Sequence, residues 1–366
     1  MNFNLTPEQQ VLKDSVRRFC AREYPFEARN TILRGDGFSR AYWASFAELG
    51  WLGAGLAEDK GGYGGGAVEN AVILEEMGRA LVLEPFLPCA VGAAQALAAL
   101  PHGEAVQAQL EAIVSGESIA VLAHDDRGET QAEKAQSGWR LAGAKRFVLG
   151  APAADVFLVS AHTKNGLSLF RVPRGAPGLC CRNYRAVDGR RVSDLTLENC
   201  DVGQDALLGS EGGTAQAIEL AQDHLLAGLC AEAIGAMDAA LWLTRDYLKT
   251  RKQFGVTLNT FQALQHRMAN MLVEVELARS MLYRALGALT GSAAAERRRT
   301  IAAAKAQIGE AGYFVGAEAV QLHGGIGVTE EYIAAHYFKR LTLVRGLYGA
   351  SDLHLMRFAQ LSRSAP

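Results

Sequence analysis

The sequence lacks several features that would assign it to a class at once. Its 366 residues include six cysteines, and none of them lies in a CxxC pair or at a Cys/His metal-ligand spacing. A metal site is therefore not expected, and we interpret the cysteines as reduced, mostly buried thiols of a cytoplasmic protein. The first residues have neither the basic nor the apolar segment of a signal peptide, so none is expected.

Charge of one sign and long apolar runs are also missing. The 37 basic and 39 acidic residues leave a net charge of −2, so nucleic acid is not an expected partner. The longest apolar stretches, at 89–100 and 225–243, are interrupted by glycine or charge, so no membrane span is expected. Apolar residues make up 49% of the chain, which is enough for large buried cores. The length of 366 residues suits two or three domains.

The hydrophobic period divides the chain into three predicted domains, and the first, at 1–117, is helical. Thr6-Pro7-Glu8-Gln9 combines a capping box with proline at the first helical position, so a helix is predicted to begin there. The glycine-rich segment 61–66 lacks a preceding buried strand and a following Lys-Ser/Thr, so we interpret it as a plain loop. Further helices are expected at Ala41–Leu49, Val68–Ala80 and Ala90–Leu100.

At 118–208 the period changes to two, which predicts a small antiparallel β-domain, interpreted as a barrel. Its strands are expected at Ser118–Ala123, Trp139–Val148, Val156–Ala161, Leu167–Val172 and Val192–Leu197. The helical period returns at 209–366, and four long helices joined by short loops predict a four-helix bundle. They are expected at Thr214–Thr250, Phe261–Leu289, Arg297–Leu322 and Glu330–Gly346, with a short helix after Ser351. The predicted fold class is α+β, with most of the chain in helices.

Two segments of the helical C-terminal part carry the strongest signal. The first, Arg251-Lys252-Gln253-Phe254-Gly255, alone suggests a helix end, with cations near the last carbonyls and glycine beyond. The second, Gln321-Leu322-His323-Gly324-Gly325-Ile326-Gly327, alone suggests a turn. Within it, His323 is interpreted as a neutral packed histidine. Together the two segments resemble the C-terminal domain of the acyl-CoA dehydrogenases.

The resemblance covers essentially the whole chain and its order of helical, β and bundle domains. It is strongest from Ala231 to Arg357, including Asp246–Gly255 and Phe261–His266. Within the family the sequence is most similar to the small subunits of two-subunit members, such as pimeloyl-CoA dehydrogenase. Comparable partner subunits occur in enzymes that oxidise steroid side-chain CoA esters.

The resemblance implies an FAD-dependent dehydrogenation of an acyl-CoA thioester, with electron-transfer flavoprotein as acceptor. It also implies that one subunit contacts the FAD of its neighbour. A planar guanidinium matches the geometry of the pyrophosphate oxygens, and glycine lets the main chain approach them closely. The residues that match these family positions are Arg251, Phe254, Gln262, Gln321, Gly324 and Gly325.

The catalytic glutamate of the family has no counterpart at either of its known positions. The Tyr-Glu-Gly-like turn is Leu347-Tyr348-Gly349-Ala350-Ser351 here, and the alternative position in the first bundle helix is Leu225. Neither glycine nor leucine can accept a proton. Asp352 is a weak candidate base, because an acid after Ser351 suits a helix N-terminus, and Asp223 is expected to face away from Leu225.

The predicted β-domain also departs from the family where its members contact their own flavin. The first stretch runs from His124 to Thr130, and the Trp-Ile-Thr-like triplet is Phe147-Val148-Leu149. We therefore expect a partner subunit, paired in a tetramer with a larger catalytic subunit that carries the glutamate. The alternatives are a self-sufficient homomeric dehydrogenase with an unusual base, and a flavin-free scaffold or CoA-ester-binding protein.

Overall fold

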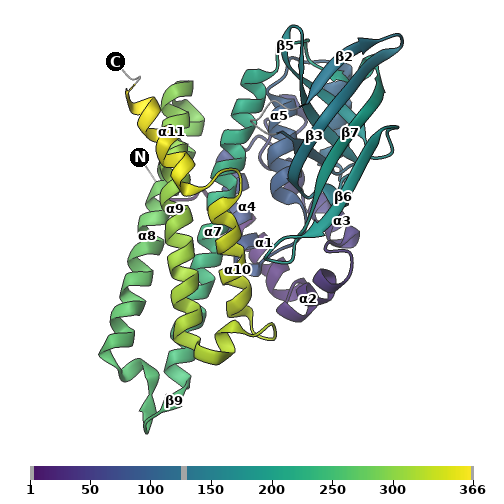
Figure 1. Ribbon diagram of the computed structural model, residues 1–366. Coiled ribbons are helices and arrows are strands. Elements are labelled where there is room, and N and C mark those ends of the chain that lie inside the picture. Colours follow the sequence, from purple (N-terminus) through teal and green to yellow (C-terminus); the bar gives the residue numbers. More distant parts are fainter. Residues whose placement is uncertain (1–3, 125–129, 364–366) are drawn as a thin grey trace. The chain divides into compact units, whose positions relative to one another are not determined.

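A computed structural model describes residues 4–124 and 130–363 (Figure 1). The contacts within the chain divide it into two compact units. The first unit is helical and comprises Met1–Thr31, Ala67–Val82 and Leu226–Pro366. The second comprises Ile32–Gly66 and Leu83–Leu225, and it contains the sheet.

The helical unit is built around α9, which packs against α8, α10 and α11 (Figure 1). The predicted capping box starts α1: the backbone N–H of Thr6 donates to Oε1 of Gln9 at 2.9 Å, and the N–H of Gln9 donates to Oγ1 of Thr6 at 3.3 Å. The predicted long helices are all present. The helices of this unit are α1 (Pro7–Glu23), α4 (Ala67–Ala80), most of α7 (Ala215–Thr250), α8 (Gln262–Gly291), α9 (Ala294–His323), α10 (Ile333–Gly346) and α11 (Ser351–Arg363).

Glycines allow α4 and α7 to cross at close range. A Cβ atom on Gly78 of α4 would overlap the backbone carbonyl of Glu232 on α7. A Cβ atom on Gly235 of α7 would likewise overlap the carbonyl of Glu75 on α4. Only glycine lets two helix backbones approach in this way, so the pair fixes where the helices meet.

A buried ion pair connects α7 to α10. Nε and Nη2 of Arg340 donate to the two carboxylate oxygens of Glu232 at 3.0 and 2.6 Å, and both side chains are nearly inaccessible to solvent. The bidentate geometry offsets part of the cost of removing both charges from water. Helix α7 is long and apolar enough to cross a membrane by length and composition, but 83% of its apolar window is buried inside the protein, as in a core helix.

The second unit contains a mixed sheet with the strand order β6-β7-β3-β2-β4-β5-β8. The expectation of a purely antiparallel sheet is wrong, because β1 and β2 each pair with β4 in parallel. The expected strands are present, whereas β2, β6 and the two-residue strand β8 were not predicted. The strands are β1 (Ala120–Ala123), β2 (Gln131–Ala135), β3 (Gly138–Leu149), β4 (Val156–Thr163), β5 (Gly166–Pro173), β6 (Leu179–Arg185), β7 (Arg191–Gly203) and β8 (Leu207–Leu208).

Short helices complete the second unit. The helix expected at Ala90–Leu100 begins earlier, with a π-helical segment at Leu87–Ala93, because Pro88 lies in the first turn, where its missing N–H costs nothing. The helices are α3 (Arg40–Glu48), α5 (Ala94–Ala98), α6 (Glu104–Val114) and part of α2 (Phe26–Arg34). The order of helical, β and helical regions is as predicted, and the boundaries at 117 and 208 remain a prediction.

Candidate functional site

A helix ends just before Arg251, as expected, but the segment after α7 is a β-hairpin that the sequence analysis did not predict. Helix α7 ends at Thr250, and β9 (Lys252–Gln253) then pairs with β10 (Val256–Thr257). The loop residues Phe254 and Gly255 have φ values of 52° and 81°. Positive φ at both loop positions is typical of a type I′ hairpin, which places Gly255 in the turn.

The hairpin presents a cation and an aromatic ring to solvent. The backbone N–H of Arg251 donates to the carbonyl of Tyr247 at 2.8 Å, and its own carbonyl accepts from Leu258 at 2.9 Å, so the backbone is fixed on both sides. Within residues 4–124 and 130–363, the exposed Arg251 guanidinium has no carboxylate partner. Phe254 is 89% exposed, and its ring meets that of Phe261 edge-on at 6.1 Å.

The second predicted segment forms an exposed glycine turn after α9. Gln321 lies in the last turn of α9, and Gly324 has φ 66° and ψ −141°, a conformation that favours glycine. A Cβ atom on Gly324 or Gly325 would meet nothing within 4 Å. The packing of this chain therefore does not require glycine at 325, whereas close approach by an external group would require it.

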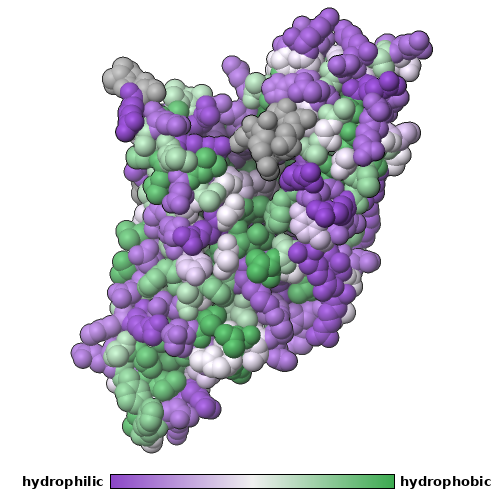
Figure 2. All heavy atoms as spheres, in the orientation of Figure 1, coloured by the Kyte–Doolittle hydropathy of each residue, from purple (hydrophilic) through white to green (hydrophobic). Residues whose placement is uncertain are grey.

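The structure brings the two predicted segments together at one end of the bundle. The ring of His323 lies over that of Tyr247, with centroids 4.5 Å apart and planes at 33°. Figure 1 shows the hairpin of β9 and the end of α9 at the same end of the helical unit. Gln262 is the first residue of α8 and is exposed. In Figure 2 this end carries a hydrophobic patch where Figure 1 labels β9.

His323 itself is buried, as expected for a packed histidine. Its Nδ1 lies 2.8 Å from the carbonyl of Ala319, and its Nε2 lies 3.3 Å from the hydroxyl of Tyr332. Burial lowers the pKa of the imidazole, against the opposing effect of the Ala319 carbonyl. The ring is therefore neutral near pH 7.

Gly349 lies in a turn that two buried side chains hold. Nζ of Lys305 donates to the carbonyls of Arg345 and Gly349, each at 3.2 Å, and Nε2 of His354 lies 3.0 Å from the carbonyl of Tyr348. Tyr348 and Gly349 have φ values of 57° and 110°. A Cβ atom on Gly349 would lie 2.8 Å from Nε2 of His354, so the turn has no room for a longer side chain without rearrangement.

The other predicted acid and base positions are Leu225, Asp223 and Asp352, and each has different surroundings. In the second unit Leu225 is buried, and its Cδ2 lies 2.9 Å from the position that a Cβ on Gly92 would take. Asp223 is also buried there. Asp352 is exposed in the first turn of α11, as expected, but Ser351, which was predicted to be the N-cap, is the first residue of that helix.

The Phe147-Val148-Leu149 triplet is held by a carboxylate of the same unit. The backbone N–H of Phe147, at φ 52°, donates to Oδ1 of Asp194 at 3.0 Å. Asp194 also accepts from Arg182 at 2.7 Å and from the Tyr184 hydroxyl at 2.8 Å. Burial alone would raise the pKa of Asp194, but these hydrogen bonds outweigh it and hold the pKa well below its ordinary range.

The structure describes only part of the segment from His124 to Thr130, the other segment at which the family contacts its own flavin. Nδ1 of His124 lies 2.8 Å from Oγ of Ser160, and Thr130 is buried with its hydroxyl donating to the Ala144 carbonyl at 3.3 Å. Residues 125–129, which the prediction included, lie outside the described residues.

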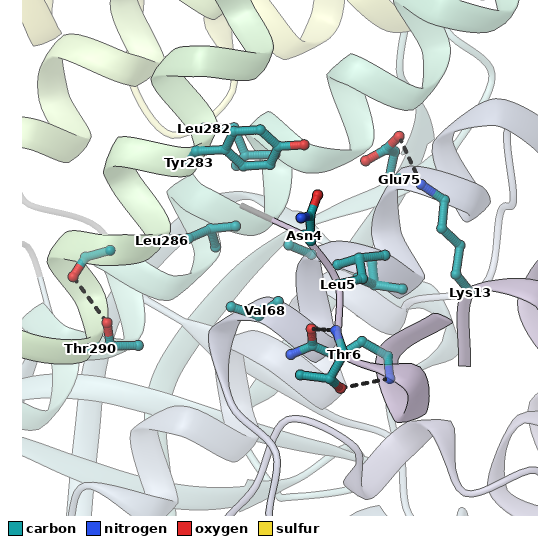
Figure 3. Close-up of a pocket in the computed structure, with 14 residues that line it drawn as sticks. Asn4, Leu5, Thr6, Lys13, Val68, Glu75, Leu282, Tyr283, Leu286 and Thr290 are labelled. Carbon is teal, nitrogen blue, oxygen red and sulfur yellow. Dashed lines mark hydrogen bonds and ion pairs between the residues drawn. The ribbon is translucent and has the colours of Figure 1, made fainter. Parts of the chain in front are cut away.

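Two pockets lie away from the predicted residues. A pocket of about 540 Å³ in the helical unit is bounded by the start of α1, by α4 and by α8, with the Lys13–Glu75 ion pair at 3.6 Å on one side (Figure 3). A second, of about 890 Å³, lies beside α6 in the unit that contains the sheet, and Glu104, Glu117, Asp155 and Asp205 are among the residues that line it. None of the six residues predicted to contact a neighbour's cofactor lines either pocket.

Comparison with known proteins decides the family. Models for the N-terminal, middle and C-terminal domains of acyl-CoA dehydrogenase match residues 6–117, 124–200 and 212–361. The acyl-CoA dehydrogenase FadE27 of Mycobacterium tuberculosis is 31% identical over 379 residues, which cover 100% of each chain. The chain belongs to the acyl-CoA dehydrogenase family.

Solved structures of similar proteins have the same fold. A chain of the ChsE4–ChsE5 complex of Mycobacterium tuberculosis superimposes with a TM-score of 0.93 at 27% identity, covering 100% of both chains. PigA with FAD and proline superimposes with a TM-score of 0.88 at 26% identity, covering 98% of both chains. The first relative is a complex of two named proteins, and the second binds FAD.

Four residues near the candidate site were not singled out from the sequence. Tyr247 and Tyr332 surround His323, and Lys305 and His354 hold the Gly349 turn. Tyr247 precedes Arg251 by one helical turn, so the sequence spacing alone could have indicated that the two residues are neighbours. The contacts of the other three depend on helix packing, which spacing in the sequence does not reveal.

Proposed function

We propose that this chain is a partner subunit of an FAD-dependent acyl-CoA dehydrogenase. It contributes contacts to the FAD of a larger subunit and carries no catalytic base of its own. One observation carries the proposal: the exposed Arg251 guanidinium has no carboxylate partner among the described residues, and it lies at the same end as the Gly324-Gly325 turn. That end offers a cation and an approachable backbone, while the turn at Gly349 offers no carboxylate.

FAD is the cofactor of this oxidoreductase, and when bound it accepts a hydride from Cβ of the acyl-CoA. The residues of this chain fit its phosphates. The planar Arg251 guanidinium would bind the pyrophosphate, and Gly324 and Gly325 would let the backbone approach it. Phe254, which is 89% exposed, would pack against the cofactor or the neighbouring subunit. Gln262 and Gln321 would donate amide hydrogen bonds from the same surface.

Proton abstraction from Cα requires a carboxylate within hydrogen-bond reach of the substrate. In this chain Lys305 and His354 occupy the inner side of the Gly349 turn and bind its carbonyls, so they cannot serve as that base. Asp352 is exposed in the first turn of α11, where a negative charge stabilises the helix N-terminus. We therefore assign the base to the larger subunit.

The occurrence of a two-protein complex among the structural relatives supports a hetero-oligomeric arrangement. We propose a tetramer of two unlike chains in the cytoplasm, with an acyl-CoA as substrate and an electron-transfer flavoprotein as electron acceptor. The small subunit of pimeloyl-CoA dehydrogenase is the model for this role, which belongs to the breakdown of fatty, dicarboxylic or steroid side-chain CoA esters.

Purification of the chain alone and together with a candidate larger subunit tests the proposal. We expect the visible absorbance of flavin only in the co-purified complex, and dye reduction by acyl-CoA only there. One tightly bound flavin in every chain of a homo-oligomer with turnover would instead identify a self-sufficient dehydrogenase. A complex that contains neither flavin nor activity would identify a scaffold or a CoA-ester-binding protein.

The Arg251→Ala variant tests the contact itself. A charge-assisted hydrogen bond to phosphate is worth about 1.5–3 kcal/mol, so FAD retention in the complex should fall roughly tenfold or more. The melting temperature should change little, because Arg251 is exposed. Arg245→Ala is the matched control, since that exposed arginine already pairs with Asp246 at 2.8 Å. Unchanged FAD retention with a large fall in melting temperature would make Arg251 a structural residue.

A further inference from the structure

We propose that His323 is a positioning residue that holds the two halves of the FAD-contacting end in register. The inference rests on the proposed function, because it assigns His323 to the same site. The observation behind it is that His323 contacts the end of α7 and the segment before α10 at once. The two motifs are distant in the sequence, and this side chain connects them in space.

The contact with α7 reaches the Arg251 backbone directly. The His323 ring lies against the Tyr247 ring in a tilted arrangement, with a centroid distance of 4.5 Å and an interplanar angle of 33°. The carbonyl of Tyr247 in turn accepts the N–H of Arg251 at 2.8 Å. A displacement of the His323 ring would therefore displace Tyr247, and through the hydrogen bond to the Tyr247 carbonyl it would displace Arg251 at the base of the hairpin.

The hydrogen bonds of the imidazole fix its tautomer. The carbonyl of Ala319 can only accept, so Nδ1 of His323, 2.8 Å away, carries the proton. Nε2 is then unprotonated and accepts from the hydroxyl of Tyr332 at 3.3 Å. The Tyr332 ring also lies against the imidazole at a centroid distance of 5.1 Å. The orientation of the ring is thus determined by α9 on one side and by the segment before α10 on the other.

The glycine turn depends on the same side chain. Gly324 follows His323 directly, and a Cβ on Gly327 would lie 2.9 Å from Cβ of His323, so the turn wraps closely around it. His323 is 3% exposed and cannot reach a cofactor outside the protein. Its role is therefore to place Arg251 and Gly324 relative to each other, without contact to FAD.

The test uses variants that change the hydrogen bonds of His323 and keep aromatic rings in place. His323→Phe retains a ring beside Tyr247 and removes both hydrogen bonds, and Tyr332→Phe removes only the hydroxyl. Tyr337→Phe is the matched control, because the Tyr337 hydroxyl donates to the Arg79 carbonyl at 2.6 Å elsewhere in the same unit. Each variant is measured in the assembled complex for FAD retention and for backbone hydrogen exchange at 251–258 and 321–329.

We expect His323→Phe to weaken FAD retention roughly three- to tenfold and Tyr332→Phe to weaken it less, in proportion to the hydrogen bonds removed. Hydrogen exchange should become faster in both segments, and the Tyr337→Phe control should leave both readouts unchanged. If His323→Phe does not fold, Tyr332→Phe alone decides. Unchanged exchange in both segments and unchanged FAD retention would overturn the inference.

The two proposals fail in different ways. If the wild-type complex binds no FAD, the proposed function falls, but the exchange measurement still decides whether His323 connects the segments. If the wild-type complex binds FAD and the His323→Phe complex exchanges and retains FAD like wild type, only the positioning role falls.

Discussion

At position 349 both the backbone conformation and the neighbouring His354 side chain disfavour any residue larger than glycine. The φ of 110° is unfavourable for residues with a Cβ, and that Cβ would lie 2.8 Å from Nε2 of His354. Nζ of Lys305 holds the carbonyl of the same residue at 3.2 Å, so the turn cannot easily shift to make room. The conformation of the turn thus depends on residues of α9 and α11.

Gly349→Glu should therefore fail to create a dehydrogenase. We expect it to destabilise the protein by about 1–3 kcal/mol through backbone strain and the contact with His354, and to give no dye reduction with acyl-CoA by the lone chain. Gly346→Glu is the matched control, because a Cβ there meets nothing within 4 Å. Thermal unfolding and a dye-reduction assay make the comparison. A stable, active Gly349→Glu protein would contradict the expectation.

Sequence patterns found the exposed residues of the candidate site better than the buried ones. Arg251 and Gly324 stand in short contiguous motifs, and the structure brings those motifs to one end of the helical unit. Their roles toward a cofactor remain a prediction. The stack of Tyr247 on His323 could not be predicted, because it forms only when α7 and α9 pack at a particular depth.

At the scale of the helix, the crossing of α4 and α7 is the most sterically restricted contact of the bundle. Gly235→Ala should destabilise the protein by about 1–3 kcal/mol or more, because the added methyl group would overlap the Glu75 carbonyl. Gly291→Ala, at the end of α8, is the control, since a Cβ there meets nothing within 4 Å. Chemical denaturation of both variants gives the comparison. Equal stabilities would show that the helices can separate at little cost.

The ion pair between α7 and α10 makes a second prediction at this scale. Arg340→Met should cost about 3–5 kcal/mol, because it leaves the buried Glu232 carboxylate without its bidentate partner. The double variant Glu232→Leu/Arg340→Met should recover much of the loss, since it removes both charges. Denaturation midpoints of the single and double variants measure this. A double variant no more stable than the single one would contradict it.

Two buried histidines predict the acid sensitivity of the bundle. Burial lowers the pKa of His323 and of His336 below the ordinary value of 6.5. Because the folded state favours the neutral rings, their contribution to stability is complete above pH 6.5. It decreases as the pH falls below 6.5 and levels off below the folded pKa values. Unfolding free energies from pH 8 to 5 should show a decline that His323→Phe reduces; an unchanged slope in that variant would contradict the assignment.

Strongly periodic elements could be predicted from the sequence, and polar ones could not. The long helices have apolar stripes that pack in the bundle, and the capping box at Thr6 marks the start of α1. Strand β6 (Leu179–Arg185) was missed because it lies at the edge of the sheet, where four of its seven residues are exposed and its sequence does not alternate between apolar and polar residues. The hairpin after α7 was missed because phenylalanine at positive φ is uncommon.

At the scale of the whole molecule, the helical unit exposes apolar side chains beyond those of the hairpin. Leu272, Val273 and Leu277 of α8 are 41%, 55% and 52% exposed, and Leu355 and Met356 of α11 are 52% and 56% exposed. Apolar surface gathered on helices favours association with another chain. The exposed rows of α8 and α11 therefore agree with a protein that works in an oligomer.

Sedimentation of the chain with its larger partner should give a hetero-oligomer that contains fewer flavins than chains. The physical reason is that, in the proposed complex, this chain would supply one side of a cofactor site and the partner would supply the other side. Leu277→Lys, which places a charge on the exposed α8 row, should weaken assembly without unfolding the monomer. Arg284→Lys on the same helix serves as a charge-preserving control. A monomeric wild-type chain in the presence of the partner would contradict this expectation.

The contact between position 349 and His354 also has an evolutionary meaning. A carboxylate can reach this turn only after residue 354 has become smaller or has moved, since Nε2 of His354 lies 2.8 Å from the place of the new Cβ. Geometry thus sets the order of two substitutions, and the opposite order passes through a strained intermediate. Directed evolution toward an active single chain would have to begin at 354.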